Sequence, residues 1–239
     1  MRNLAIRGAM LGARTAAWSG GGVPWDYRLE YVASDFRQIF DTKLKPTLGM
    51  SAEMDIMFTA TNNDDAFLCC KGVGNTRFNF CGYFKYQNQD SYYGYYYVLS
   101  IADGGSVQTI PSRSSSIYQK DAITLNERAV FKATTSQSRR ELYKNGELIG
   151  YGEKFISSNS PEVSLRMFGR IWNGTTLGAY CSARAYDVKI YDANNVMIRH
   201  YIPCVMNGVV GLWEECQKEF FHSETATPFI AGPRVSDEL

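Results

Sequence analysis

The sequence predicts an all-β protein in which two antiparallel sheets pack face to face. From Tyr27 onward, short runs of β-branched and aromatic residues alternate with clusters of turn formers, and no long helical periodicity interrupts them. Asn145-Gly146 lies between two alternating runs, and this dipeptide is a strong hairpin signal because both turn residues need positive φ. The aromatic fraction of 14%, with 16 tyrosines, also suits a two-layer β architecture. Roughly a dozen strands in such an arrangement indicate a sandwich of jelly-roll type.

Composition bounds the classes of function. The 239 residues are enough for one large sandwich, and a net charge of +1 provides no electrostatic footprint for nucleic acid. No apolar run reaches the roughly 20 residues that a membrane helix needs, so membrane insertion is not expected. The six cysteines have no C-x-x-C spacing, which favours buried free thiols over a zinc site.

Residues 1–26 are expected to form a separate N-terminal arm. They are rich in Ala and Gly, lack strand alternation and end near the flexible joint 19–22. We expect this extended arm to dock on a neighbouring molecule, the alternative being that it folds back on its own sandwich. The expected domains are thus the arm, a sandwich over 27–232 and a tail over 233–239. The arm residues expected to make the assembly contacts are Arg2, Leu4, Ile6, Arg7, Met10, Leu11, Arg14 and Trp18.

The first half of the sandwich begins with expected strands at 27–33 and 37–41, which lead into a turn at Pro46. The next strand, 51–58, alternates clearly. A period of two places Glu53, Asp55 and Met57 on one face, and its opposite face holds Ala52, Met54, Ile56 and Phe58. The further strands of this half are expected at 67–71, 76–86 and 92–102.

In the second half, a strand at 126–134 precedes the hairpin around Asn145-Gly146, whose arms are 140–144 and 147–151. Turn formers at 192–195 predict another hairpin. Pro203 is expected to end the pairing of this second hairpin, because proline has no N–H for a ladder. The remaining strands are expected at 163–171, 180–186, 186–190 and 196–202.

After Ile202-Pro203 the chain continues as short apolar pieces. These are Gly211-Leu212-Trp213-Glu214, Phe220-Phe221 and Phe229-Ile230-Ala231-Gly232. Their order resembles the closing segment of laminin-G-like, concanavalin A-like lectin–glucanase sandwiches of the kind found in bacteriophage structural proteins. The hairpin over 141–151, ELYKNGELIGY, is similar to one that recurs in laminin-G-like domains. The resemblance implies a concanavalin A-like jelly roll.

The same resemblance implies a non-enzymatic structural protein of a bacteriophage virion, as a head decoration, fibre or tail appendage. It would be assembled in the cytoplasm of the bacterial host. The arm would attach it to other virion proteins, the chain would form homo-oligomers, and the sandwich would be exposed for adhesion to host-surface polysaccharide. The alternatives are a carbohydrate-binding module of a bacterial surface protein and a divergent glycoside hydrolase.

The segment Glu53-Met54-Asp55-Ile56-Met57 resembles the Glu-x-Asp-x-Glu strand of laminarinase-type hydrolases. Retaining hydrolysis needs two carboxyl groups about 5–5.5 Å apart. Met57 replaces the third acid, so we expect no catalytic residue and interpret Glu53 and Asp55 as solvent-facing. His200 has no recognisable nucleophile partner and is interpreted as a surface or interface residue.

The tyrosine-rich run 91–97 is the main predicted contact surface. In a strand, Tyr93, Tyr95 and Tyr97 share one face and would form a platform for stacking on sugars or on a protein, unless loops cover it. Trp172 and Asn173 are a second predicted contact. No cofactor is expected. Ca²⁺ at the oxygen-rich loop 62–65 is the alternative that the resemblance suggests, although one loop rarely supplies six to eight oxygens.

Overall fold

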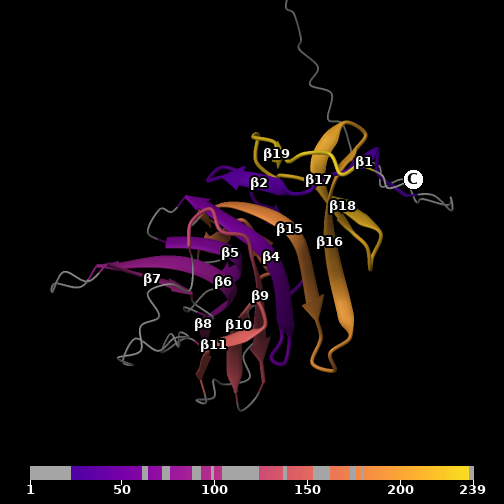
Figure 1. Cartoon of the computed structure of the whole chain (residues 1–239). Coiled ribbons are helices and arrows are strands. Elements are labelled where there is room, and N and C mark those ends of the chain that lie inside the picture. Colours follow the sequence, from indigo (N-terminus) through magenta and orange to yellow (C-terminus); the bar gives the residue numbers. More distant parts are fainter. Residues whose placement is uncertain are drawn as a thin grey trace, which may run out of the picture.

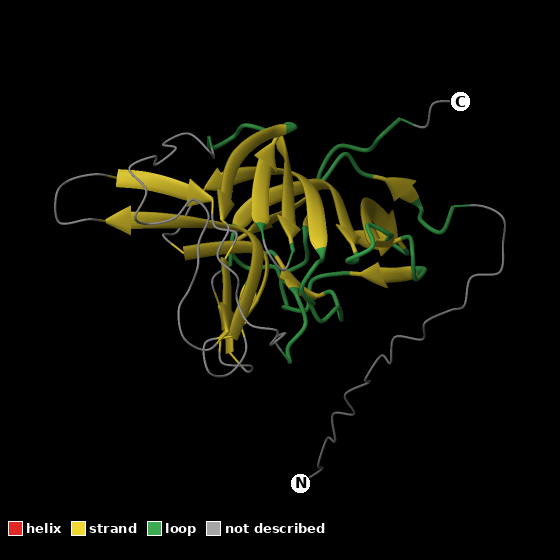
Figure 2. Cartoon of the chain, turned by 90° about the horizontal axis from the view of Figure 1, so that it is seen from below, coloured by secondary structure: helices red, strands yellow, loops and turns green. Residues whose placement is uncertain are grey.

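The structure, a computed structural model, describes residues 23–60, 64–71, 76–87, 93–97, 100–103, 124–136, 139–152, 162–172, 176–178 and 180–236. Regular structure within these ranges is β-strand throughout, and every strand pairing is antiparallel. Figure 2 shows this all-strand character of the described chain. The same ranges contain no helix with the length and apolarity that a membrane span requires.

The larger sheet follows a continuous path of eight strands and has three short strands attached beside it (Figure 1). The attached strands are β1 (Tyr27–Arg28), β2 (Val32–Asp35) and β19 (Ile230–Ala231). In spatial order the path is β11 (Glu147–Gly152), β10 (Arg140–Lys144), β9 (Ala129–Thr135), β4 (Ser51–Ala60), β15 (Ser182–Tyr191), β16 (Met197–Met206), β17 (Val209–Glu214) and β18 (Glu219–Phe221).

The smaller sheet contains six strands, and a short hairpin packs beside it without pairing to either sheet. The hairpin consists of β13 (Arg170–Trp172) and β14 (Thr176–Gly178). The smaller sheet runs through β3 (Phe40–Asp41), β12 (Arg166–Met167), β5 (Asp64–Lys71), β6 (Thr76–Gln87) and β7 (Tyr93–Tyr97), with β8 (Ser100–Asp103) also paired to β6.

The two sheets are joined by a connected series of aromatic rings, called here the aromatic seam. On one side of the core, Phe58 of β4 meets Phe67 of β5 with ring centroids 6.5 Å apart. On the other side, Phe40 of β3 meets Tyr201 of β16 at 5.8 Å. The full seam is Phe58, Phe67, Phe168, Phe229, Phe40, Tyr201 and Phe221. Each pair lies in the distance range of favourable ring contacts, and the predicted two-sheet antiparallel sandwich is confirmed.

Local sequence signals correspond to the observed strands where they are strongest. Ala52, Met54 and Ile56 of β4 are completely buried, as their alternation predicts. The hairpin between β10 and β11 turns at Asn145 and Gly146, with φ of 51° and 83°. Because only residues tolerant of positive φ fit there, the Asn-Gly prediction is confirmed.

The prediction for Pro203 is wrong. The residue lies inside β16, opposite Leu212 of β17, and the pairing continues to Met206. Its carbonyl accepts a hydrogen bond from the Leu29 N–H at 3.0 Å. The nitrogen and the carbonyl oxygen of one strand residue point to the same side of the strand. The nitrogen of Pro203 therefore faces β1, at a level of β16 that β15 no longer reaches. The ladder to β17 therefore loses no hydrogen bond.

Gly211 in the Gly-Leu-Trp-Glu motif is required by close packing. A Cβ at this position would lie 2.2 Å from the carbonyl oxygen of Phe221 and 2.6 Å from the ring of Phe220. Only a residue without a side chain lets β17 and β18 approach this closely.

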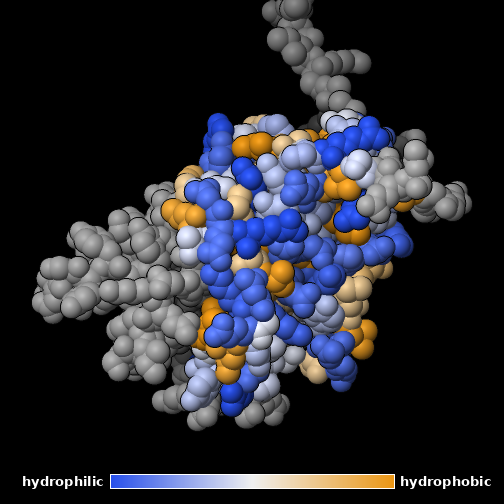
Figure 3. Space-filling model, in the orientation of Figure 1, coloured by the Kyte–Doolittle hydropathy of each residue, from blue (hydrophilic) through white to orange (hydrophobic). Residues whose placement is uncertain are grey.

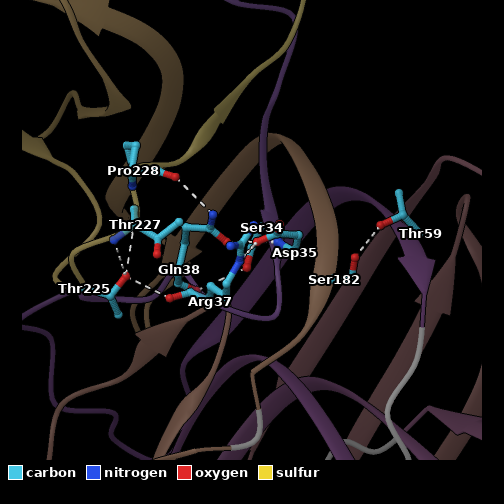
Figure 4. A network of polar contacts seen from close by, with 9 residues as sticks. All are labelled: Ser34, Asp35, Arg37, Gln38, Thr59, Ser182, Thr225, Thr227 and Pro228. Carbon is cyan, nitrogen blue, oxygen red and sulfur yellow. Dashed lines mark hydrogen bonds and ion pairs between the residues drawn. The ribbon is translucent and has the colours of Figure 1, made fainter.

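The C-terminal segment is fastened across the end of the sandwich to the chain around Gln38 (Figure 4). Gln38 is completely buried, and its Nε2 donates to the Pro228 carbonyl at 3.0 Å. The Thr225 hydroxyl donates to the Arg37 carbonyl at 2.8 Å. Nearby, the Arg166 guanidinium forms ion pairs with both Asp41 and Glu224. Polar contacts therefore hold the segment that delivers Phe221 and Phe229 to the aromatic seam.

The expected assembly arm falls mostly on residues 1–22, outside the described ranges, so its predicted contacts stay predictions. The last residues of the expected arm do contact the sandwich. Trp25 meets Trp213 with ring centroids 6.5 Å apart, and the Asp26 N–H donates to the Val205 carbonyl at 2.8 Å.

All six cysteines are free thiols, and all except Cys216 are buried. Burial raises the pKa of the Cys70 and Cys181 thiols well above the ordinary value. It also raises the pKa of Cys204 to about 12. Thiols that stay protonated are poor nucleophiles. The prediction of buried free thiols is confirmed for five of the six cysteines and is wrong for Cys216, which is exposed.

Phe40→Ala should destabilise the protein by roughly 3–5 kcal/mol, because the ring contacts both sheets and its removal leaves a cavity. Urea unfolding followed by tryptophan fluorescence measures this loss. Val209→Ala is the control, since Val209 is 43% exposed and should change the free energy of unfolding by less than about 0.5 kcal/mol. Equal effects of the two substitutions would contradict a central role for the aromatic seam.

Candidate functional site

The outer face of the larger sheet carries a row of charged side chains. Strand alternation that buries Met54 sends Glu53 to the opposite side. Strand register then places Glu53 opposite Lys132 of β9 and opposite Lys189 of β15, and Lys189 opposite His200 of β16. Hydrophilic residues predominate in Figure 3 over the area where Figure 1 labels β4, β15 and β16.

At one end of this row the face is hollowed. The hollow has a volume of about 350 Å³ and opens to solvent, and it is lined by Glu53, Val130, Lys132, Thr134, Tyr143 and Gly146. These residues come from β4, β9, β10 and the β10–β11 turn. The lining combines an ammonium group, a carboxylate, hydroxyls and one aromatic ring, which is a chemistry able to bind a small polyhydroxylated molecule.

Tyr143 is held in place by its polar neighbours. Its hydroxyl donates to Glu141 Oε2 at 2.7 Å, and Glu141 Oε1 pairs with Arg139 Nε at 2.6 Å. The hydrogen bond to Glu141 raises the pKa of Tyr143, because it stabilises the protonated phenol. The ring therefore presents a fixed orientation to the hollow.

The acids nearest the hollow are paired with cations. Arg128 donates two hydrogen bonds to the Asp55 carboxylate, at 2.9 and 2.8 Å, in the bidentate geometry that guanidinium groups favour. The Lys189 ammonium lies 2.7 Å from Asp187 and 3.9 Å from Glu53. These contacts neutralise much of the negative charge on this face.

His200 bridges two carboxylates. Its Nε2 lies 2.7 Å from Asp187 Oδ1, and its Nδ1 lies 2.8 Å from Glu215 Oε2. Both ring nitrogens can donate only in the imidazolium form, so two carboxylates at these distances favour the protonated ring. Consistently, the hydrogen bond with Asp187 raises the pKa of His200 against the opposing effect of burial. His200, interpreted from the sequence as a surface or interface residue, is part-buried with 17% of its side chain exposed, and it links β15 to the turn after β17.

Asp187 lies on the same face and contacts both His200 and Lys189. Burial by itself raises its pKa, but hydrogen bonds from His200 and Lys189 outweigh that effect and leave the pKa below its ordinary value. A general acid in glycoside hydrolysis needs the opposite shift. Asp187 is therefore a permanent anion at neutral pH.

The sequence-predicted contact residues lie elsewhere. Tyr93, Tyr95 and Tyr97 belong to β7 of the smaller sheet, where they pair with Gln87, Lys85 and Tyr83 of β6. Trp172 ends β13, and Asn173 lies outside the described residues. The structure does not bring these positions onto the hollowed face, and their role in binding stays a prediction.

The loop considered for Ca²⁺ is described only in part. Asn62 and Asn63 lie outside the described ranges, whereas Asp65 is a completely buried residue of β5. Over the described residues, no group of three or more His, Cys, Asp or Glu side chains is arranged to hold a metal ion.

Sequence reasoning missed Lys132, Thr134 and Tyr143. Lys132 and Thr134 alternate with Phe131 and Ala133, so the period of two does place them on the outer face. Their proximity to Glu53 depends on the pairing of β9 with β4, whose paired residues are about eighty positions apart in the sequence. No local pattern carries that register.

Comparison with known proteins adds little. No protein-family model matches the chain, and no curated protein matches it. One similar solved structure is the κ-carrageenase from Pseudoalteromonas carrageenovora in complex with an oligotetrasaccharide of κ-carrageenan, with 8% sequence identity and a TM-score of 0.24. The match covers 69% of this chain and 64%, less than two thirds, of that chain. A TM-score this low supports no argument about function.

The free energy of unfolding should depend on pH through His200. Its pKa in the folded state lies above the ordinary value of 6.5, so its stabilising effect is complete below about pH 6.5. That effect should be lost as the pH rises through the folded-state pKa. Urea unfolding of the wild type and of His200→Gln between pH 6 and 9 measures the difference, which should shrink with rising pH.

The groups that face His200 are Asp187 and Lys189 of β15, together with Glu214 and Glu215. The Glu214 carboxylate accepts a hydrogen bond from the backbone N–H of His200 at 2.8 Å. His222→Gln is the matched control, because His222 Nδ1 contacts a backbone carbonyl rather than a carboxylate. If the His222 variant, and not the His200 variant, removed the pH dependence, the imidazolium bridge would be ruled out.

Proposed function

We propose that this chain is a non-enzymatic polysaccharide-binding sandwich. The observation that carries the proposal is the hollow on the outer face of the larger sheet, with Tyr143 beside Lys132, Glu53 and Thr134. Sugar rings bind to proteins through an aromatic ring against their C–H face and through polar groups that meet their hydroxyls. The hollow provides both kinds of contact from rigid strands.

The state of the neighbouring acids supports binding rather than hydrolysis. Asp55 is engaged in two hydrogen bonds with Arg128, and Asp187 is kept ionised by His200 and Lys189. Hydrolysis of a glycosidic bond needs one carboxyl group that remains protonated to act as an acid. Neither acid suits that role.

We propose further that the sandwich is a structural component of a bacteriophage virion, attached through the arm over residues 1–26 and exposed to the host surface. The proposal is supported by the sequence patterns at 141–151 and 202–232 and by the composition of the arm. A carbohydrate-binding module of a bacterial surface protein would use the same hollow, and the two differ in what the arm contacts.

Binding is tested by electrophoresis through gels that contain dextran, pullulan, galactomannan, laminarin, alginate or dextran sulfate. The wild type should be retarded by at least one of these polymers, and Lys132→Ala and Tyr143→Ala should weaken the retardation about tenfold or more, each through loss of roughly 1.4 kcal/mol of binding free energy. Lys218→Ala is the charge-matched control, since Lys218 lies in an exposed turn of the same sheet. If none of the polymers retarded the wild type, polysaccharide binding would be wrong.

A second candidate function is glycoside hydrolysis, which the position of Glu53 inside the hollow favours. We expect no release of reducing sugar from any polymer that binds, and no difference between the wild type and Glu53→Gln. Turnover by the wild type that disappears in Glu53→Gln would overturn the non-enzymatic proposal.

Deletion of residues 1–22 should prevent incorporation into the assembly and leave the sandwich folded, because the strands of both sheets are formed by residues from Tyr27 to Ala231. Thermal unfolding checks the fold, and copurification with particles checks incorporation. Normal incorporation of the truncated chain would refute the arm's role.

A further inference from the structure

A second aromatic residue lies beyond the hollow, on the edge strand β11. Tyr151 has 54% of its surface exposed. An exposed tyrosine presents a flat apolar ring and a hydroxyl, which are the two kinds of contact that a sugar can use.

Tyr151 lies on the same face of the sheet as the hollow. Strand register places it opposite Glu141 of β10. Glu141 accepts the hydroxyl hydrogen bond of Tyr143, the aromatic residue of the hollow, at 2.7 Å. The Glu141 carboxylate therefore lies between the two tyrosines, on a line that runs from the hollow across β10 to the edge of the sheet.

The Tyr151 ring is held in place rather than free to rotate. The Arg139 guanidinium lies 4.6 Å from its centroid, in a cation–π arrangement. Arg139 is itself fixed by Glu141 at 2.6 Å. The Arg139 guanidinium thus covers one face of the Tyr151 ring. The exposed surface of Tyr151 belongs to the remainder of its side chain. A single carboxylate orients both tyrosines, which limits the entropy lost when a ligand binds.

Charge along this line identifies the chemistry of the ligand. The hollow holds Glu53 and Lys132, and the strip beyond it holds Glu141 and Arg139, so carboxylates and cations are equal in number. A polyanion would meet two carboxylates with no excess of positive charge. An uncharged polyhydroxylated chain fits better, because it can accept hydrogen bonds from the cations and donate to the carboxylates while its rings stack on the tyrosines.

We infer that Tyr151, positioned by Arg139 and Glu141, forms a second sugar-stacking subsite that extends the Tyr143 hollow, so that the face binds a chain of several uncharged sugars. This inference rests on the proposed polysaccharide binding. The hollow binds one short part of the chain, and the subsite at Tyr151 adds affinity only for ligands long enough to reach it.

The test compares oligosaccharides of two and six sugars, cut from whichever of dextran, pullulan, galactomannan or laminarin retards the wild type most. Isothermal titration calorimetry should show that Tyr151→Ala weakens binding of the six-sugar ligand about tenfold and leaves binding of the two-sugar ligand unchanged. Tyr143→Ala should weaken both. Tyr151→Phe keeps the ring and should behave as the wild type, which assigns the effect to the ring rather than to the hydroxyl. Unchanged binding of the two-sugar ligand by Tyr151→Ala excludes a folding defect as the cause.

Different failures are distinguishable. Binding of both lengths that is unaffected by Tyr151→Ala would overturn the subsite and leave the hollow intact. Preference for alginate or dextran sulfate over every neutral polymer would overturn the uncharged ligand. If no polymer of either kind bound the wild type, the proposed function would fail, and the subsite would fail with it.

Discussion

The contact on which the structure depends is the aromatic seam between the two sheets. Phe58 on Phe67 and Phe40 on Tyr201 join the sheets at two separate places, and Phe168 and Phe229 connect those places through the core. Large rings bury much apolar surface and tolerate few alternative packings. The seam therefore determines which face of each strand points inward.

The side chains that the aromatic seam buries also determine which side chains lie on the outer face of the larger sheet. Because strand side chains alternate, burial of Met54 and Phe131 obliges Glu53 and Lys132 to point to solvent. Charges gathered there need partners, and the network of Lys189, Asp187 and His200 provides them. The His200 ring, which lies between two carboxylates, also connects β15 to the turn after β17, so the polar face adds its own link across the sheet.

Sequence reasoning succeeded where a signal was local. The Asn145-Gly146 turn and the alternation of β4 were predictable because backbone preference and side-chain period act within a few residues. It failed for Pro203. Proline is tolerated inside β16 because its nitrogen faces away from β17, and the sequence does not show which strand that nitrogen faces. It also missed the two carboxylate partners of His200, because one lies on β15 and the other in the turn after β17.

By itself the sequence determined an antiparallel β-sandwich, its strongest hairpin and the inward face of its clearest strand, since these depend on local conformational preference. Only the tertiary structure decided that Tyr143 and Lys132 share a hollow with Glu53, and that Tyr151 lies on the same face. Strand register across long sequence separations is set by packing of the whole core. For that reason, the candidate site became visible only when β4, β9, β10 and β11 were side by side.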